Sequence, residues 1–200
     1  MDFDKIELSI LWKNKEEVFN RLNKWDIKNI HLDIMDGYFV SNLSNITPFS
    51  LNKLWIDNKY NLHLHLMVKN PEIYFSYFSF LKNTKKLSFH IEIEYFKNNT
   101  YKVFVNWLQQ KWIKVWLTLN PDTKINLLSN KLGEFDFIQL MTVYPWKWWQ
   151  KFIEKMFSKI EKLRKIYDWE IIIDGWVNQG IYEKLKNKVN TFVMWSYLFK

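Results

Sequence analysis

The sequence predicts an α/β fold, a (β/α)8 barrel, and three observations support that prediction. Short apolar runs alternate with amphipathic stretches along the whole chain, which favours parallel strands joined by right-handed helical crossovers. There are eight such runs in 200 residues, close to the lower size limit of a barrel. No glycine-rich turn follows the first run, so an open doubly wound sheet of the dinucleotide-binding kind is the second choice.

The predicted strands are the short apolar runs 5–11, 29–35, 61–67, 86–91, 113–119, 136–141, 170–173 and 191–194. The predicted helices lie between them, at 15–23, 48–55, 71–81, 100–110, 123–128, 150–166 and 177–186. The segment 152–166 has the clearest three-four spacing of apolar residues. Asn70-Pro71 and Asp122-Thr123 are typical of helix starts. After the eighth run we expect the last helix to be short or missing.

Composition narrows the function classes. The chain has no cysteine, so it has neither a disulfide framework nor thiolate chemistry. No apolar run reaches membrane-spanning length, and the acidic start of the chain is unlike a signal peptide. We expect one domain over residues 1–200 in a cytoplasmic protein. The net charge of +8 comes from scattered lysines, which predicts a weak attraction for phosphorylated substrates and neither a nucleic-acid nor a membrane partner.

Residues 31–37 are the most informative segment. Strand alternation places His31, Asp33 and Met35 on one face, and Leu32 and Ile34 on the other. A histidine and an aspartate two apart on one face are typical of two metal ligands, or of a ligand beside a proton-transfer group. A half-buried strand with a polar end has the same pattern, so these residues alone leave both alternatives open.

Other candidate residues lie where a parallel barrel places its reactive groups, at the carboxyl ends of strands. These ends carry Ser9, His31, Asp33, Met35, His63, His65, Met67, His90, Glu92, Met141 and Asp174.

Seven segments of the chain follow the order of a known family. They are Ser9-Ile10-Leu11, residues 31–37 with Phe39-Val40, residues 65–68 with Asn70-Pro71-Glu72, Phe89-His90 with Glu92, Leu119-Asn120-Pro121 with Thr123, Met141-Thr142-Val143 with Pro145 and Gln150, and Asp174-Gly175 with Val177-Asn178. In this ordered set the chain resembles the ribulose-phosphate 3-epimerase family over nearly its whole length. The resemblance implies a barrel of the ribulose-phosphate-binding type.

The resemblance implies an isomerase of the pentose phosphate pathway that interconverts D-ribulose 5-phosphate and D-xylulose 5-phosphate, so a phosphorylated ketose is the expected substrate. It implies one divalent ion held by His31, Asp33, His65 and Asp174. This donor set suits Zn²⁺ or Fe²⁺, with Mn²⁺ and Co²⁺ as alternatives. The ion would stabilise the enediolate that forms when the C3 proton leaves. Asp33 and Asp174 would be the catalytic bases on its two faces.

The resemblance also implies contacts with the substrate, through Ser9, Met35, Met67, Met141, Gly175 and Ser196. The three methionines would form a soft, dry cap over the enediolate, although methionines at strand ends are often ordinary core residues. His63 matches no family role and is interpreted as an ordinary polar position. His90 and Glu92 are interpreted as supporting or structural residues, and Asp36 as a residue that fixes a turn.

The phosphate half of the expected site departs from the family pattern. The family binds phosphate with backbone N–H groups of glycine-rich turns, but this chain has other residues at the expected glycines: Trp146, Trp148, Trp149, Trp176 and Trp195. Trp25, Trp112 and Trp116 also stand where the family favours glycine. The chain has 12 tryptophans and 4 glycines, and random mutation does not convert one residue type to one other at conformationally special positions.

We therefore hypothesise UGA recoding, in which UGA codons read here as tryptophan encode glycine in the organism. Some bacterial lineages read UGA as glycine, and the absence of alanine with abundant Lys, Asn, Ile, Phe and Tyr indicates an A/T-rich genome. If the tryptophans are real, bulky rings occupy a loop that needs left-handed backbone. The barrel would then be non-catalytic, or would use residues 146–149 at a membrane surface or a single-stranded nucleic acid.

Two further alternatives stay open. A 3-epimerase of a six-carbon ketose phosphate, such as allulose 6-phosphate, would keep the same metal and acid–base residues and differ in the length of its pocket. A short or missing last helix would leave the first and eighth strands uncovered, which predicts either a homo-oligomer contact or an incomplete gene model.

Overall fold

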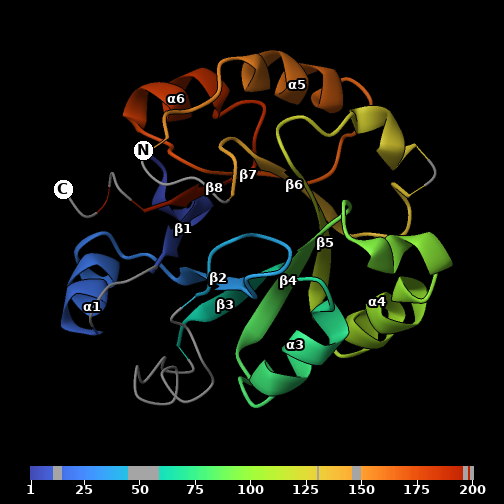
Figure 1. Ribbon diagram of the computed structural model, residues 1–200. Helices are drawn as coiled ribbons and strands as arrows, with labels where there is room; N and C mark the ends of the chain where they lie inside the picture. The colour runs from blue at the N-terminus through green and yellow to red at the C-terminus, as the bar shows by residue number, and fades with distance from the viewer. Residues whose placement is uncertain (11–14, 45–58, 130, 146–149, 196–197, 199–200) are drawn as a thin grey trace.

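A computed structural model shows eight parallel strands that close into a barrel in chain order (Figure 1). The structure describes residues 1–10, 15–44, 59–129, 131–145, 150–195 and 198. β1 pairs with both β2 and β8, which closes the barrel, so the (β/α)8 prediction is confirmed. The strands are β1 (Ile6–Ser9), β2 (Asn29–Met35), β3 (Asn61–Met67), β4 (Thr84–His90), β5 (Lys114–Leu119), β6 (Phe137–Met141), β7 (Ile171–Asp174) and β8 (Thr191–Met194).

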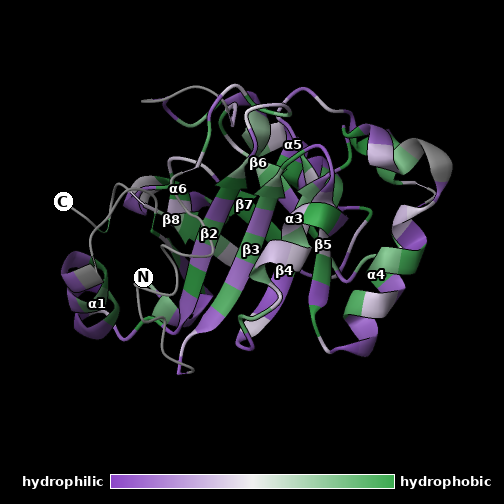
Figure 2. Cartoon of the chain, turned by 60° about the horizontal axis from the view of Figure 1, so that its bottom comes forward, coloured by the Kyte–Doolittle hydropathy of each residue, from purple (hydrophilic) through white to green (hydrophobic). Residues whose placement is uncertain are grey.

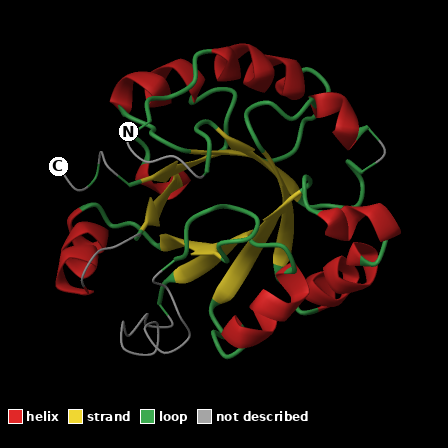
Figure 3. Cartoon of the chain, viewed as in Figure 1, coloured by secondary structure: helices red, strands yellow, loops and turns green. Residues whose placement is uncertain are grey.

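The α-helices that the structure describes lie outside the ring of strands (Figure 3). The α-helices are α1 (Lys15–Lys24), α3 (Pro71–Phe78), α4 (Tyr101–Gln110), α5 (Lys155–Arg164) and α6 (Gln179–Leu185). Short 3-10 helices are η1 (Phe3–Lys5), η2 (Glu94–Asn98) and η3 (Ile125–Leu128). The helix predicted over 48–55 lies outside the described residues, as do 196, 197, 199 and 200 after β8.

Two helix predictions need correction. The stretch 123–128 forms only the 3-10 helix η3, and Asp122 does not cap it, because its carboxylate accepts hydrogen bonds from Tyr144, at 2.8 Å, and Lys155. The helix predicted from residue 150 begins at Lys155, because the Gln150 side chain bonds instead to the backbone of Tyr144. In both places a contact distant in sequence overrides a local helix signal.

Alternation along the strands separates two interiors. Leu32 and Ile34 face outward and belong to the large apolar cluster between strands and helices, whereas His31 and Asp33 face into the barrel, as predicted. Figure 2 shows the resulting hydrophilic and hydrophobic bands along β3. Inside the barrel, Trp116, Ile172 and Val193 pack together. The buried polar side chains of His31, Asp33 and His63 share this dry interior.

Two tryptophans lie in left-handed backbone conformation. Trp112 has φ 61° and Trp176 has φ 45°. The other described non-glycine residues with positive φ are Asp26 and Asn99, residue types that tolerate this region far better than a bulky aromatic does. Trp112 and Trp176 are among the positions expected to favour glycine, and the observed backbone supports that expectation at both.

Candidate active site

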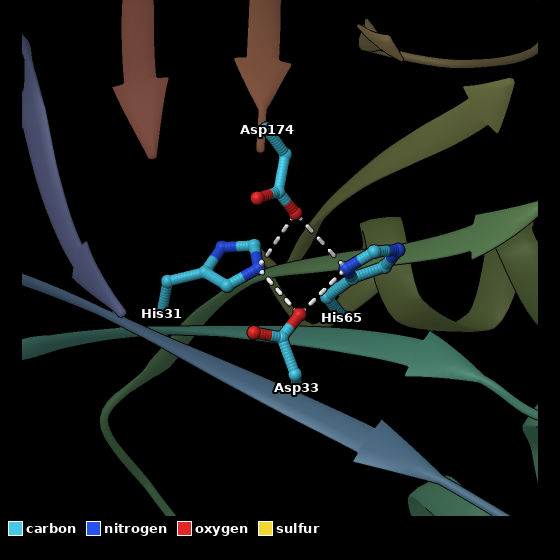
Figure 4. Close-up of side chains that lie close together, drawn as sticks. All are labelled: His31, Asp33, His65 and Asp174. Atoms are coloured by element: carbon cyan, nitrogen blue, oxygen red, sulfur yellow. Dashed lines mark hydrogen bonds and ion pairs between the residues drawn. The ribbon is translucent and has the colours of Figure 1, made fainter. Parts of the chain in front are cut away.

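Four buried side chains from three strands form a closed ring inside the barrel (Figure 4). His31 and Asp33 come from β2, His65 from β3 and Asp174 from β7. His31 Nε2 lies 3.1 Å from Asp33 Oδ1 and 3.3 Å from Asp174 Oδ2. His65 Nδ1 lies 2.9 Å and 3.3 Å from the same two oxygens. The structure thus brings together the four residues that the sequence predicts as metal ligands.

Opposite charges dominate this ring despite its burial. Burial alone would lower the pKa of His31 and raise that of Asp33, because it penalises each charged form. The carboxylates of Asp33 and Asp174 nevertheless raise the pKa of His31 well above its usual value, and His31 holds the pKa of Asp33 well below its usual value. The pKa of His65 is raised against burial by the same two carboxylates. The ring therefore favours positive charge between its carboxylates.

The donor set and its spacing fit a divalent ion. The four donor atoms lie within 4.8 Å of one another. Donors that each bind an ion at about 2.1 Å are about 3 to 3.4 Å from their neighbours in a tetrahedral or square arrangement, which matches the 2.9 to 3.3 Å edges observed. A bound ion would replace the protons that the two imidazoles otherwise carry. The residues present thus fit the expected metal.

His65 is supported from behind by a second histidine and a carboxylate. Its Nε2 lies 3.0 Å from His90 Nε2, and His90 Nδ1 lies 3.2 Å from Glu92 Oε2. Glu92 in turn accepts a hydrogen bond from the Asn120 backbone N–H at 2.8 Å. This chain fixes the ring orientation of His65 and leaves Nδ1 facing the carboxylates, which agrees with the supporting role expected for His90 and Glu92.

Four residues expected to contact the substrate are the last residues of their strands: Ser9, Met35, Met67 and Met141. Ser9 donates a hydrogen bond to Asp33 Oδ2 at 3.2 Å. Met35 and Met67 are register partners at the ends of β2 and β3, and they pack together with Val40. Met141 is buried at the end of β6, beside Asp174 of β7. These are the positions expected of an apolar cap, and that role stays a prediction.

The loop after β7 carries a strict requirement for glycine. Gly175 has φ +117°, and a Cβ there would lie 2.4 Å from Val143 Cγ2. Thr142 Oγ1 donates to the carbonyl oxygens of Asp174, at 3.0 Å, and Gly175, which holds the loop against β6. Trp176 follows in left-handed conformation and is 38% exposed. Trp195, directly after β8, is half-buried. Four expected site residues lie outside the described residues: Trp146, Trp148, Trp149 and Ser196.

Sequence reasoning missed two inward-facing residues, Glu7 and Gln139, and misinterpreted a third, His63. Glu7 is fully buried on β1, and its Oε2 lies 2.7 Å from His63 Nδ1 and 3.3 Å from His31 Nδ1. His63 is therefore part of a buried network, not the ordinary polar position predicted for it. Gln139 of β6 donates to Asp174 Oδ2 at 3.1 Å. The available signal was alternation, since Glu7 is two residues before Ser9 on the same strand face.

Comparison with known proteins identifies the family. The model of the ribulose-phosphate 3 epimerase family matches residues 5–199. The chain belongs to this family. It is 30% identical over 156 residues to the ribulose-phosphate 3-epimerase of Bacillus subtilis, covering 75% of this chain and 69% of that protein. It is 33% identical over 181 residues to the Buchnera aphidicola (Acyrthosiphon pisum) enzyme of that name, covering 86% and 75%. The family predicted from the motifs is thus confirmed.

Solved structures with the same fold are more distant in sequence. A mutant tryptophan synthase α-subunit from Pyrococcus furiosus superposes with a TM-score of 0.69 at 14% identity, covering 98% of this chain and 89% of that one. At this identity the likeness shows the fold alone. Among the described residues, no helix has both the length and the apolar character needed to cross a membrane.

Proposed function

We propose that this epimerase-family chain is a metal-dependent ribulose-phosphate 3-epimerase, which interconverts D-ribulose 5-phosphate and D-xylulose 5-phosphate. One observation supports this proposal most directly. Asp33 and Asp174 come from β2 and β7 and approach the two imidazoles from opposite sides (Figure 4). Inversion of a carbon centre requires a proton acceptor on one face and a proton donor on the other, and this arrangement supplies both.

The residues of the chain divide the reaction between them. Either Asp33 or Asp174 removes the C3 proton as a carboxylate, and the other, protonated, delivers a proton to the opposite face. The chemistry that a divalent ion supplies, when His31, Asp33, His65 and Asp174 hold it, is stabilisation of negative charge beside the carbon that loses its proton. Ser9 holds Asp33 in place through Oδ2, which leaves Oδ1 in the ring. Met35, Met67 and Met141 exclude water from the planar intermediate.

The substrate and its surroundings are part of the proposal. A phosphorylated ketose fits a chain with net charge +8 and a carboxylate pair at the mouth of a barrel. The loop at Gly175 and Trp176 would contact the phosphate through its backbone. A relative at 31% identity over 150 residues is the cytoplasmic isoform of ribulose-phosphate 3-epimerase from rice, Oryza sativa, covering 73% of this chain and 64% of that protein. A cytoplasmic location is proposed on that ground.

The test is an epimerase assay in D₂O with D-ribulose 5-phosphate, with and without a chelator, for the chain as written and with glycine at its eight expected positions. We expect D-xylulose 5-phosphate deuterated at C3, and loss of turnover after chelation. Asp174→Asn should lower kcat by about 100-fold or more, whereas Asp122→Asn, an exposed carboxylate bonded to Lys155, should not. If neither chain turns over the substrate, the proposed epimerase activity is refuted. A preference for a six-carbon ketose phosphate would change the proposed substrate. A rate that does not respond to the chelator would refute the proposed metal dependence.

A further inference from the structure

A second buried cluster lies directly beneath the metal-ligand ring and shares one residue with it. Glu7 Oε2 faces two imidazoles, His63 Nδ1 at 2.7 Å and His31 Nδ1 at 3.3 Å. Glu7 Oε1 accepts a hydrogen bond from Lys86 Nζ at 2.8 Å. His63 Nε2 lies 2.8 Å from Ser88 Oγ. The metal function proposed above uses none of Glu7, His63, Lys86 or Ser88.

The cluster is built to hold the Glu7 carboxylate in one orientation. Glu7 and His31 are fully buried, and His63 is 1% exposed. Lys86 Nζ, His63 Nδ1 and Ser88 Oγ set this orientation through hydrogen bonds that do not involve Trp116. In the sequence as written, the Trp116 indole also packs edge-on against His63, with centroids 4.4 Å apart. A carboxylate held by an ammonium on one oxygen presents its other oxygen as a fixed acceptor.

The geometry selects one tautomer of His31. The 2.7 Å contact between His63 Nδ1 and Glu7 Oε2 requires a proton on that nitrogen, so His63 donates to Glu7 and accepts at Nε2 from Ser88. His31 Nδ1 then lies 3.3 Å from Glu7 Oε2 and 3.0 Å from the His63 nitrogen, which donates to that same oxygen. A lone pair on His31 Nδ1 would face the negative carboxylate, whereas a proton there is donated to it, so Glu7 favours the proton on Nδ1. In a neutral imidazole this leaves the lone pair on Nε2, the atom that faces Asp33 and Asp174.

We propose that Glu7 is a positioning residue of the metal centre. It fixes His31 as the Nδ1–H tautomer, with Nε2 directed at the ion, and His63 and Lys86 hold Glu7 in place. The inference rests on the proposed metal-dependent function. It gives His31 the same kind of support that His90 and Glu92 give His65, with the two ring nitrogens exchanged. A carboxylate behind a ligating histidine orients the ring and raises its basicity.

The same atoms do not form a second metal site. Glu7, His31 and His63 each offer a donor atom within 4.8 Å of the others. An ion there would need a lone pair on His31 Nδ1 while Nε2 already ligates the first ion, so the ring would have to lose both protons. The Lys86 ammonium, 2.8 Å from the other Glu7 oxygen, would also repel a cation. The expected stoichiometry is one ion per chain.

The experiment measures ion affinity, by competition with a chelator, for the wild-type chain, Glu7→Gln and Glu170→Gln. Glutamine keeps the size of Glu7 but can offer its oxygen to the imidazoles only by turning its NH₂ group toward the Lys86 ammonium. We expect Zn²⁺ binding to weaken by about 10- to 100-fold in Glu7→Gln. Glu170 also lies near Lys86, 3.8 Å away, outside the network, so Glu170→Gln should bind like the wild type.

A second measurement needs no variant and covers the case in which Glu7→Gln does not fold. In the Zn²⁺-loaded wild-type protein, ¹⁵N-histidine spectra should show His31 with a proton on Nδ1 and the ion on Nε2. The opposite tautomer, two ions per chain, or equal affinity in Glu7→Gln would overturn the inference while leaving the metal function in place. A wild-type chain that binds no ion would overturn both the inference on Glu7 and the proposed metal function. The ion affinity of the wild-type chain therefore distinguishes the two failures.

Discussion

Replacement of Trp112 by glycine tests whether the backbone conformation at this position favours glycine. Trp112 connects α4 to β5 with φ 61°, and its ring is 90% exposed. Its backbone N–H donates to the Gln109 carbonyl at 2.9 Å, a bond that glycine retains. The substitution therefore removes little packing and leaves the backbone hydrogen bonding of the turn intact, so its effect on stability comes almost entirely from the backbone conformation.

The magnitude follows from two opposing contributions. A residue with a Cβ in left-handed conformation costs about 1 to 2 kcal/mol, and glycine removes that cost. Glycine also gains more conformational freedom in the unfolded chain, which lowers stability by about 0.5 to 1 kcal/mol. The difference predicts that Trp112→Gly stabilises the fold by about 0 to 1.5 kcal/mol, with a central value of about 0.75 kcal/mol.

Urea unfolding followed by circular dichroism measures this difference without relying on tryptophan fluorescence. The matched control is Trp169→Gly, because Trp169 is 67% exposed, lies outside the regular elements, and is not among the described residues with positive φ. At position 169 only the entropic contribution applies, so the free energy of unfolding of Trp169→Gly should fall by about 0.5 to 1 kcal/mol. A midpoint for Trp112→Gly at or below that of the control would refute the reasoning.

Two other predictions follow from the same structure. Gly175→Ala should destabilise the fold by about 2 to 3 kcal/mol in the urea assay, because its Cβ would lie 2.4 Å from Val143 Cγ2 at φ +117°; unchanged stability would contradict this geometry. Burial lowers the pKa of His63 from 6.5 to about 3, so between these values the unfolded chain binds the extra proton and stability falls as pH falls. This loss, about 1.4 kcal/mol per pH unit, should be absent in His63→Gln, and equal pH slopes in the two proteins would refute it.

The metal-ligand ring could be predicted from strand alternation and the family resemblance together. Alternation places His31 and Asp33 on one strand face, and the barrel gathers the carboxyl ends of its strands, but the resemblance is needed to add His65 and Asp174 to the set. The strand bounds also agree within two residues, since apolar runs buried on both sides are hard to mistake for loops.

The support beneath the ring could not be predicted in the same way. Glu7 and His63 lie deeper in the barrel than the metal-ligand ring. Whether a polar residue there is buried and paired depends on the side chains that neighbouring strands place against it. Here those side chains are Trp116 of β5 and Lys86 of β4. Such contacts depend on the register between strands, which no pattern within one strand specifies. The prediction that Asp122 begins a helix was wrong for the same reason, because its hydrogen-bond partners Tyr144 and Lys155 are distant in sequence.

The two halves of the site bear on the recoding hypothesis together. The four proposed metal ligands form a complete ring, whereas Trp112 and Trp176 occupy backbone that favours glycine. Trp116 fills the barrel with its indole N–H unpaired, a cost that glycine would not carry. Decay of function has no reason to spare buried ligands, but a misread codon changes one residue type and leaves histidine and aspartate untouched. The intact mass of the protein from its native host should therefore be lower than the mass of the written sequence by at least eight tryptophan-to-glycine differences. A mass that matches the written sequence would refute the hypothesis.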